Sequence, residues 1–221
     1  MKNALKTEWD LKLFYKSPKD PQIEKDVEAI EKAYAAFEKK YKNSEEYLKD
    51  GKKLLNALED WDRLTSVAGV WKPVIYLHYC KDLDASNNEV ESLSNKITQR
   101  LTHSANTILF FSLKLSKIDP LDQKKFLADR SLKDFYYFLE LIFKQAKYNL
   151  SESEEKIINL KSLPAHELWV NGQKKLLNVQ TVKFEGEDLP LPQAFGKLSD
   201  LPTKKRRKLY DDVMVVLKGI S

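Results

Sequence analysis

The chain has 221 residues, 42% of them hydrophobic and 32% charged, and a formal net charge of +5, a balance that argues against disorder and indicates a folded globular protein. The single Cys80 excludes an intrachain disulfide framework and fits a reducing compartment, and the sequence shows neither a signal peptide nor a membrane-spanning stretch. With only 6 Gly and 8 Pro, the composition favours long helices.

An apolar anchor at Trp9–Tyr15 precedes the first predicted helix and requires a larger body on which to pack. Asp20 is placed to accept hydrogen bonds from the first helical turn, and Pro21 suits the first helical position. The helix is predicted to present one apolar stripe, because hydrophobic residues recur at helical spacing at Ile23, Val27, Ile30, Tyr34, Phe37 and Tyr41.

Two more long helical segments are predicted before residue 120. The first carries Leu54, Leu58 and Trp61, and Pro73 predicts a kink or a new helix after it. The second rises from the polar turn at 84–88 and keeps a helical stripe from Leu93 to Leu115. It should form a rod of roughly 29 residues, about 40–45 Å long, packed against the helix before it.

Shorter elements are predicted from residue 121 onward. Ser151–Glu154 forms a capping box, so a helix should begin there and stop near Leu163-Pro164. Alternation at Thr181–Glu185 predicts a strand, with a hairpin turn at Gly186-Glu187 and a return strand at 188–191. Thr203 is expected to cap a last helix, whose apolar stripe consists of Leu209, Val213, Val216 and Ile220.

The residues with catalytic or metal-binding chemistry do not form a recognisable constellation. His166-Glu167 begins like the zinc signature HExxH, but Val170 stands where the second His is needed. His78 and Cys80 have only His103 near them in sequence, which does not complete a ligand set. We therefore predict no catalytic and no metal-binding residue in this chain, and the substrate-binding residues stay unknown.

Two other clusters have a structural and a functional interpretation. The cations of Lys204–Lys208 are able to contact phosphates, but they open an amphipathic helix, so we favour a solvated helix face and expect no nucleic-acid partner. The rings of Phe135–Phe138 cannot all lie on one helix face. Some of them should therefore face another element or form a peptide-binding wall.

The order of these features resembles the beginning of oligoendopeptidase F-type zinc metallopeptidases, which are similar in plan to thimet oligopeptidase. The resemblance rests on Trp9-Asp10-Leu11 with Phe14-Tyr15, on Ser162-Leu163-Pro164 with Leu168-Trp169, on the hairpin at 181–186, and on the basic helix around Arg207. It implies a helical, cytosolic endopeptidase that cuts short peptides inside a deep cleft. In that family, zinc is held by HExxH and a downstream Glu, and none of these residues is present here.

We therefore predict a mainly α fold, an elongated multi-helix array with long antiparallel helices and a small β-hairpin near 181–191. Residues 1–221 should form a single helical domain, with long helices in 1–120 and shorter helices plus the hairpin in 121–221. The resemblance implies the N-terminal region of a cytoplasmic zinc oligoendopeptidase, which is inactive alone. Zinc is expected in the C-terminal part, and short peptides and that catalytic part are the expected partners, with no membrane.

A free-standing helical scaffold that binds proteins or peptides is the alternative. The two interpretations differ in what they expect of the surface, since a scaffold should cover the stripe of its last helix, whereas a separated region should expose an apolar patch. The sequence decides neither the peptide specificity nor the oligomeric state. It also does not decide whether this piece is produced by truncation or by a split gene.

Overall fold

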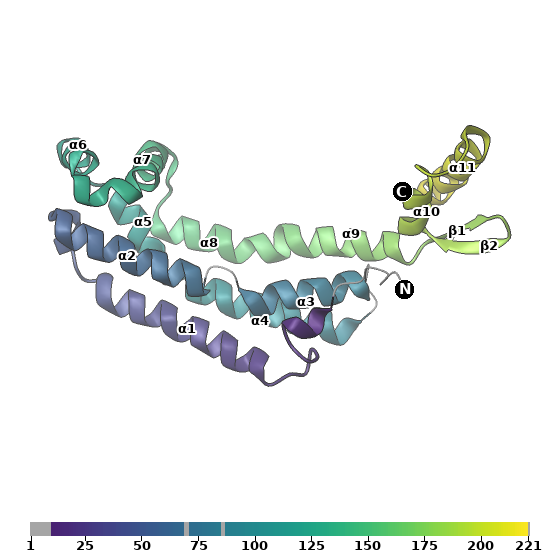
Figure 1. Cartoon of the computed structure of the whole chain (residues 1–221), viewed down its shortest axis with the longest axis horizontal. Helices are drawn as coiled ribbons and strands as arrows, with labels where there is room; N and C mark the ends of the chain where they lie inside the picture. Colours follow the sequence, from purple (N-terminus) through teal and green to yellow (C-terminus); the bar gives the residue numbers. More distant parts are fainter. Residues whose placement is uncertain (1–9, 69–70, 85–86, 221) are drawn as a thin grey trace, which may run out of the picture. The chain divides into compact units, whose positions relative to one another are not determined.

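The computed structural model describes residues 10–68, 71–84 and 87–220, so the predicted role of Trp9 lies outside the described residues. The prediction of a mainly α fold with one β-hairpin is confirmed (Figure 1). The chain divides into two compact units, one ending at Ser162 and one starting at Leu163. Whether both fold together as one cooperative domain is not decided by this division, so the single domain over 1–221 stays a prediction.

The first unit consists of helices joined by short turns. Its α-helices are α1 (Gln22–Tyr41), α2 (Gly51–Ala68), α3 (Lys72–Leu83), α4 (Asn88–Asn106), α5 (Leu109–Ser116), α6 (Pro120–Ala128), α7 (Tyr136–Gln145) and α8 (Glu152–Ser162). Short 3-10 turns occur at Leu11–Leu13, Glu46–Leu48, Arg130–Phe135 and Ala146–Tyr148. Helix α1 packs against α2 and α4, and α3 packs against α4 (Figure 1). No helix among the described residues has the length and hydropathy needed to cross a membrane.

At the start of α1 the predicted role of Asp20 is confirmed, but Pro21 precedes the helix, which begins at Gln22. The Asp20 carboxylate accepts hydrogen bonds from the backbone N–H of Gln22 and of Lys16, each at 2.9 Å, which lowers the Asp20 pKa. Every residue of the predicted α1 stripe is buried. From the preceding anchor, Tyr15 is buried, stacks edge-on against Tyr76 at 5.0 Å and donates a 2.7 Å hydrogen bond to Asp26.

An aromatic cluster around Phe111 forms the centre of this unit. The Phe111 side chain is fully buried, and its ring centroid lies 5.1 Å from Phe37 of α1, 4.9 Å from Trp61 of α2 and 5.3 Å from Tyr47. Tyr41 adds a fourth ring at 6.1 Å. Aromatic pairs at such distances contribute beyond the area that they bury. The cluster therefore fixes α1, α2 and α5 against one another.

Arg100 connects α4 to α1 from the edge of the core. Its guanidinium donates to both carboxylate oxygens of Glu31, at 3.0 and 2.9 Å, and to Glu24 at 2.7 Å. Such a two-pronged pair fixes geometry as well as charge, because both groups are planar. The contact joins residues far apart in sequence and helps to set the register of the two helices.

The predicted 29-residue rod is wrong, because the chain leaves the helix between α4 and α5. The Thr107 hydroxyl donates a 2.8 Å hydrogen bond to the Ser104 carbonyl, and Ile108 adopts φ −105° and ψ 2°. Short hydroxyl side chains compete with the helical backbone in this way. The break brings Ile108 and Phe111 into the core, where both are buried.

Pro73 begins a new helix, one of the two outcomes predicted for it. Trp71 precedes α3 with a left-handed backbone, φ 43° and ψ 54°. Its indole N–H donates a 3.1 Å hydrogen bond to the Tyr34 hydroxyl of α1. This contact holds the strained residue in place.

Helix α8 begins at the predicted capping box. The Glu154 N–H donates to the Ser151 hydroxyl at 3.3 Å, while the Glu154 carboxylate accepts from the Ser151 N–H at 2.8 Å. Asn159 of α8 donates a 2.9 Å hydrogen bond to the buried Asn106 of α4. Helix α8 ends at Ser162, so the predicted stop near Leu163-Pro164 is confirmed. The backbone widens there into a π-helical turn, Leu163–Glu167, which accommodates a proline that has no N–H to donate.

The second unit combines α9 (Leu168–Asn178) with the hairpin β1 (Thr181–Phe184) and β2 (Glu187–Pro190), followed by α10 (Leu191–Lys197) and α11 (Thr203–Gly219). Its strands are antiparallel, and Val182 lies opposite Leu189. The inward residues of the hairpin pack against Leu209 and Val213 of α11, both fully buried. This small core is separate from the aromatic cluster of the first unit.

Two predicted details of this unit are corrected. The hairpin turns at Glu185-Gly186, one residue earlier than predicted, with φ of 54° and 92° at the two positions. Positive φ at both central residues is the signature of a type I′ two-residue turn. Thr203 does not cap α11 but is its first residue, and Pro202 precedes it without a side-chain cap.

Removal of the central ring should test the aromatic cluster. We expect Phe111→Ala to lower the free energy of unfolding by about 3–5 kcal/mol, because the cavity lies among rings that cannot collapse into it. Urea denaturation measures this loss. Leu121→Ala, at a side chain that is 68% exposed, is the control and should change stability by less than about 0.5 kcal/mol. Equal effects of the two substitutions would contradict the assigned core.

Two glycine-to-alanine substitutions should change the stability of the second unit in opposite directions. Gly186→Ala should destabilise the second unit by about 1–2 kcal/mol, because φ at this position is 92°. Gly172→Ala should stabilise it by about 0.5–1 kcal/mol, because the residue is helical and an added Cβ would meet nothing within 4 Å. Thermal unfolding of both variants checks the pair, and the same sign for both would argue against the assigned backbone.

Candidate functional site

The structure does not bring the potential metal ligands together. His78 lies on α3 with its Nε2 3.6 Å from the Asp82 carboxylate, and Cys80 is partly buried on the same helix. His103 is exposed on α4, and His166 is exposed in the π-helical turn. Among residues 10–68, 71–84 and 87–220, no group of three His, Cys, Asp or Glu side chains is close enough to hold a metal ion.

Acidic side chains at helix starts and the basic run at 204–208 form contacts with nearby groups of their own unit. Glu46 forms an ion pair with Lys53 at 2.8 Å, and Glu154 belongs to the capping box. In the basic run, Lys205 donates to the Glu185 carboxylate at 2.7 Å, which lowers the Glu185 pKa. Arg206 donates to the Leu201 carbonyl at 2.9 Å. These contacts favour a structural role of the basic run over phosphate binding.

The aromatic run at 135–138 is divided between core and surface. Phe135, Tyr136 and Phe138 pack in part against the first core, and the Tyr136 hydroxyl donates a 2.8 Å hydrogen bond to the Asp129 carbonyl. Tyr137 points outward and is 78% exposed. The expectation that one helix face cannot bury all these rings is thus confirmed.

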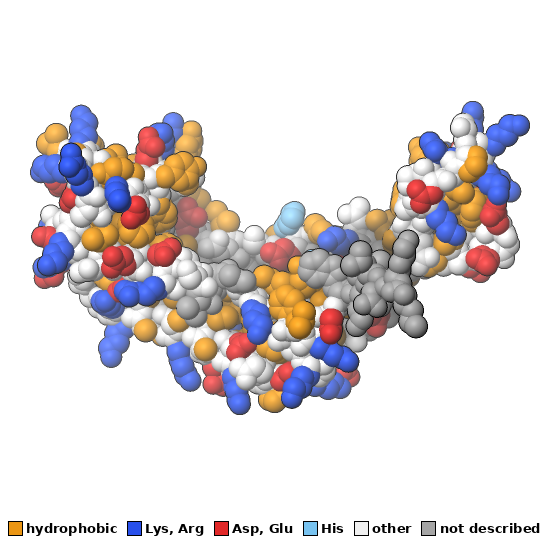
Figure 2. Space-filling model, in the orientation of Figure 1, with side chains coloured by type: hydrophobic (Ala, Val, Ile, Leu, Met, Phe, Trp, Pro, Cys, Tyr) orange, Lys and Arg blue, Asp and Glu red, His pale blue; other side chains and the backbone are white. Residues whose placement is uncertain are grey.

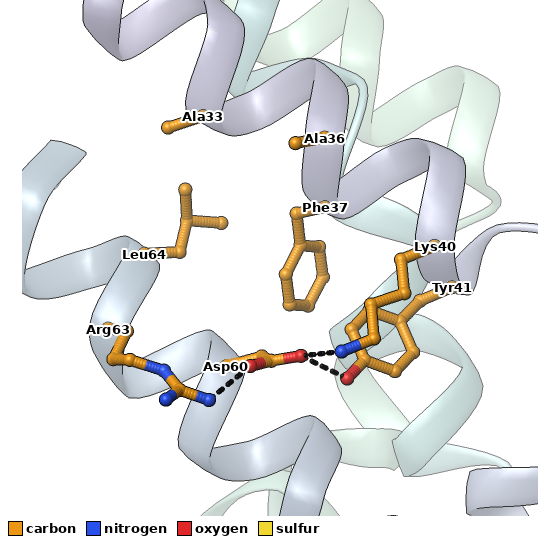
Figure 3. Close-up of a pocket in the computed structure, with 8 residues that line it drawn as sticks. All are labelled: Ala33, Ala36, Phe37, Lys40, Tyr41, Asp60, Arg63 and Leu64. Carbon is orange, nitrogen blue, oxygen red and sulfur yellow. Dashed lines mark hydrogen bonds and ion pairs between the residues drawn. The ribbon is translucent and has the colours of Figure 1, made fainter.

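A groove on the surface of the first unit lies between α1 and α2 (Figure 3). It has a volume of about 290 Å³, and its wall is apolar, made by Ala33, Ala36, Phe37 and Leu64. Asp60 lies at one end and accepts hydrogen bonds from Lys40, from the Tyr41 hydroxyl and from Arg63, as the dashed lines in Figure 3 mark. Phe37 and Tyr41 also belong to the aromatic cluster, so the groove rests on the core.

The charges at the groove are coupled. Burial opposes the ionisation of Asp60, but the hydrogen bonds from Lys40, Tyr41 and Arg63 outweigh it and hold the Asp60 pKa below its ordinary value. The same contact with Asp60 raises the pKa of Lys40. Burial, followed by the hydrogen bond to Asp60, raises the pKa of Tyr41. At neutral pH the group therefore consists of two cations, one carboxylate and a neutral phenol.

This arrangement suits binding rather than bond cleavage. The Asp60 carboxylate already accepts three hydrogen bonds, so it is poorly placed to remove a proton from a substrate. The apolar wall can accept a hydrophobic side chain of a peptide or of another element. This site was not predicted from the sequence. The spacing of Asp60 and Arg63 on one helix is compatible with an ion pair and is visible in the sequence. The contact between Asp60 and Lys40 depends on how α1 and α2 pack.

Asp60→Asn should test the charged end of the groove. We expect it to lower the free energy of unfolding by about 1–2 kcal/mol at pH 7, because an amide cannot serve the same three donors. Since the folded-state pKa is lowered, the carboxylate stabilises the fold above its unfolded pKa of about 4, and this contribution is lost as the pH falls through the folded pKa. Denaturation of both proteins between pH 7 and about pH 2 measures the difference.

The matched control is Asp62→Asn, which replaces an exposed carboxylate on the same helix and should change the free energy of unfolding by less than about 0.5 kcal/mol at pH 7. A difference between Asp60→Asn and the parent that stays constant down to about pH 2 would argue against the assigned ionisation.

Comparison with known proteins identifies one family. The family model described as Oligopeptidase F matches residues 114–175, which run from α5 into α9. No curated protein sequence matches the chain significantly. A crystal structure of oligoendopeptidase-F from Enterococcus faecium has a similar fold, with a TM-score of 0.69 at 14% sequence identity. That similarity covers 90% of this chain and 40% of the other, so this chain spans less than half the length of that enzyme.

A second solved structure, from Chlamydophila abortus and provisionally assigned as a peptidase, is 20% identical over 95% of this chain and 35% of its own, with a TM-score of 0.43. Such a score carries no argument about fold. By the family match over 114–175 and by the fold of the Enterococcus faecium enzyme, this chain resembles the N-terminal region of an oligoendopeptidase F-type peptidase.

Proposed function

We propose that this chain is the N-terminal helical region of a zinc-dependent oligoendopeptidase, an enzyme that hydrolyses short peptides. The observation that carries the proposal is the agreement of the family match over 114–175 with a fold similarity that extends over 90% of the chain. Because the chain spans 40% of the matched enzyme, the activity, the substrates and the partners of a whole peptidase are part of the proposal.

The chemistry of peptide hydrolysis is proposed to lie in the C-terminal part. A zinc peptidase needs three protein ligands around the metal, plus a carboxylate that activates the attacking water. The described residues of this chain bring no such ligands together. The chain alone is therefore expected to be inactive, and its partners are the catalytic part and the short peptides bound by that part.

The proposed contribution of this chain is to form part of the wall of the substrate cleft, in a cytoplasmic enzyme. A wall needs rigid elements that carry apolar side chains without being covered by their own core. The α6–α7 segment meets this description, since Tyr137 is 78% and Leu141 39% exposed beside rings that pack inward. Hydrophobic side chains are visible at this part of the surface in Figure 2.

A free-standing, non-catalytic scaffold is the second candidate, and one observation favours it. The stripe of α11 is covered inside its own unit, with Leu209 and Val213 fully buried and Val216 partly buried. The scaffold interpretation expects this burial. Tyr210 and Val215 of α11 lie off this stripe and are exposed, and many other exposed hydrophobic side chains lie on α7, α8 and α9. A missing catalytic part would cover such side chains.

Peptide cleavage separates the two candidates. The assay compares the 221-residue chain with an extended polypeptide, by which we mean this chain continued into the sequence encoded after Ser221, on a quenched fluorescent peptide. We expect cleavage only by the extended polypeptide, and its loss when a chelator removes zinc. Restoration by added zinc is the control. Chelator-sensitive cleavage by the 221-residue chain would contradict the proposal, as would the absence of HExxH both from the extension and from the neighbouring genes.

A further inference from the structure

Helix α9 carries an exposed apolar face within the second unit. The exposed fraction is 76% for Trp169, 61% for Val179, 48% for Leu176 and 40% for Leu168. At 3.6 residues per turn, Leu168 and Val179, the residue that follows α9, lie along one line of the helix. Leu176 and Trp169 lie along a second line about 80° away, so all four are within about 100° of the circumference. We call these four residues the α9 face.

The α9 face is not the side by which α9 joins its own unit. Leu177 lies outside this arc, about 180° around the helix from Leu168, and packs against the hairpin core. A surface helix needs one apolar side to hold it in place, and α9 has two. The second side contributes nothing to the small core and leaves an indole and three aliphatic side chains in water.

Gly172 lies within the same arc, about one turn from both Leu168 and Leu176. An added Cβ at Gly172 would meet nothing within 4 Å, so the backbone is open at this point. A glycine between two leucines leaves room for a side chain of another element to approach the helix closely. The α9 face therefore has a depression at Gly172 between the side chains of Leu168 and Leu176, a shape that suits the packing of another helix.

We propose that the α9 face is the docking surface for the C-terminal catalytic part, an inference that rests on the proposed function. Two observations lead to this occupant. The family match ends at residue 175, so it includes the first turns of α9 with Leu168 and Trp169. The similar oligoendopeptidase is much longer than this chain, which covers 40% of it, and thus has a large further part to place against such a face.

The size of the face favours a partner on the same polypeptide over a second copy. From Leu168 to Val179 the face extends over about 16 Å of helix. A stable dimer of separate chains buries about 800 Å² on each partner, which is much more surface area than the four side chains of the α9 face provide. A tethered partner is present at a high effective concentration, so a small apolar face is sufficient to hold it.

Cysteine labelling tests this docking directly. Leu176→Cys is introduced into the 221-residue chain and into the extended polypeptide, each with Cys80→Ser, and its reaction rate with a maleimide is measured. We expect labelling to be at least tenfold slower in the extended polypeptide, because the side chain becomes buried there. Lys174→Cys, on the same helix but off the face, is the matched control and should react at similar rates in both. Val179→Cys repeats the test at a second position.

The outcomes separate docking from the proposed function when peptide cleavage is measured on the same samples. Equal labelling of Leu176→Cys and Val179→Cys in both polypeptides would overturn the docking surface, while chelator-sensitive cleavage would leave the proposed function standing. Protection in an extended polypeptide without cleavage would overturn the choice of a catalytic partner. Labelling of the 221-residue chain that slows as its concentration rises would assign the face to a second copy instead.

Discussion

The packing of Phe111 against rings from α1, α2 and the turn at Glu46–Leu48 is the contact on which the first unit depends. Trp61 stacks on it at 4.9 Å, and Phe37 and Tyr47 approach within 5.3 Å. Rigid rings leave few alternative arrangements, because each can rotate about only two side-chain bonds. The angle between α1 and α2 follows from this cluster, and with it the shape of the groove whose wall includes Phe37.

The sequence predicts those features of this fold that depend on local chemistry. The α1 stripe, the Ser151–Glu154 capping box and a hairpin near 181–191 are all observed, because periodicity, capping and turn residues act within a few positions. The errors occur where packing overrides a local pattern. The stripe from Leu93 to Leu115 continues at helical spacing, yet the chain breaks at Thr107-Ile108 because the break brings Phe111 into the aromatic cluster.

The candidate sites were less predictable than the fold, for a related reason. Lys40 and Asp60 are 20 positions apart and meet only because α1 and α2 pack together. The apolar residues of α9 were visible in the sequence, but periodicity does not distinguish a side that is covered by the core from one that stays in water. Leu177 and Leu176 are neighbours of the same type, and only the first packs against the hairpin.

Together these features fit the proposed division of labour, in which this region supports peptide hydrolysis and a C-terminal part carries it out. The first unit has an aromatic core and a surface groove, and the second has a small core and the exposed apolar α9 face. The direct test of this division is the zinc content of the purified 221-residue chain and of the extended polypeptide. The account predicts about one tightly bound zinc ion in the extended polypeptide and essentially none in the 221-residue chain. One zinc ion held tightly by the 221-residue chain itself would contradict it.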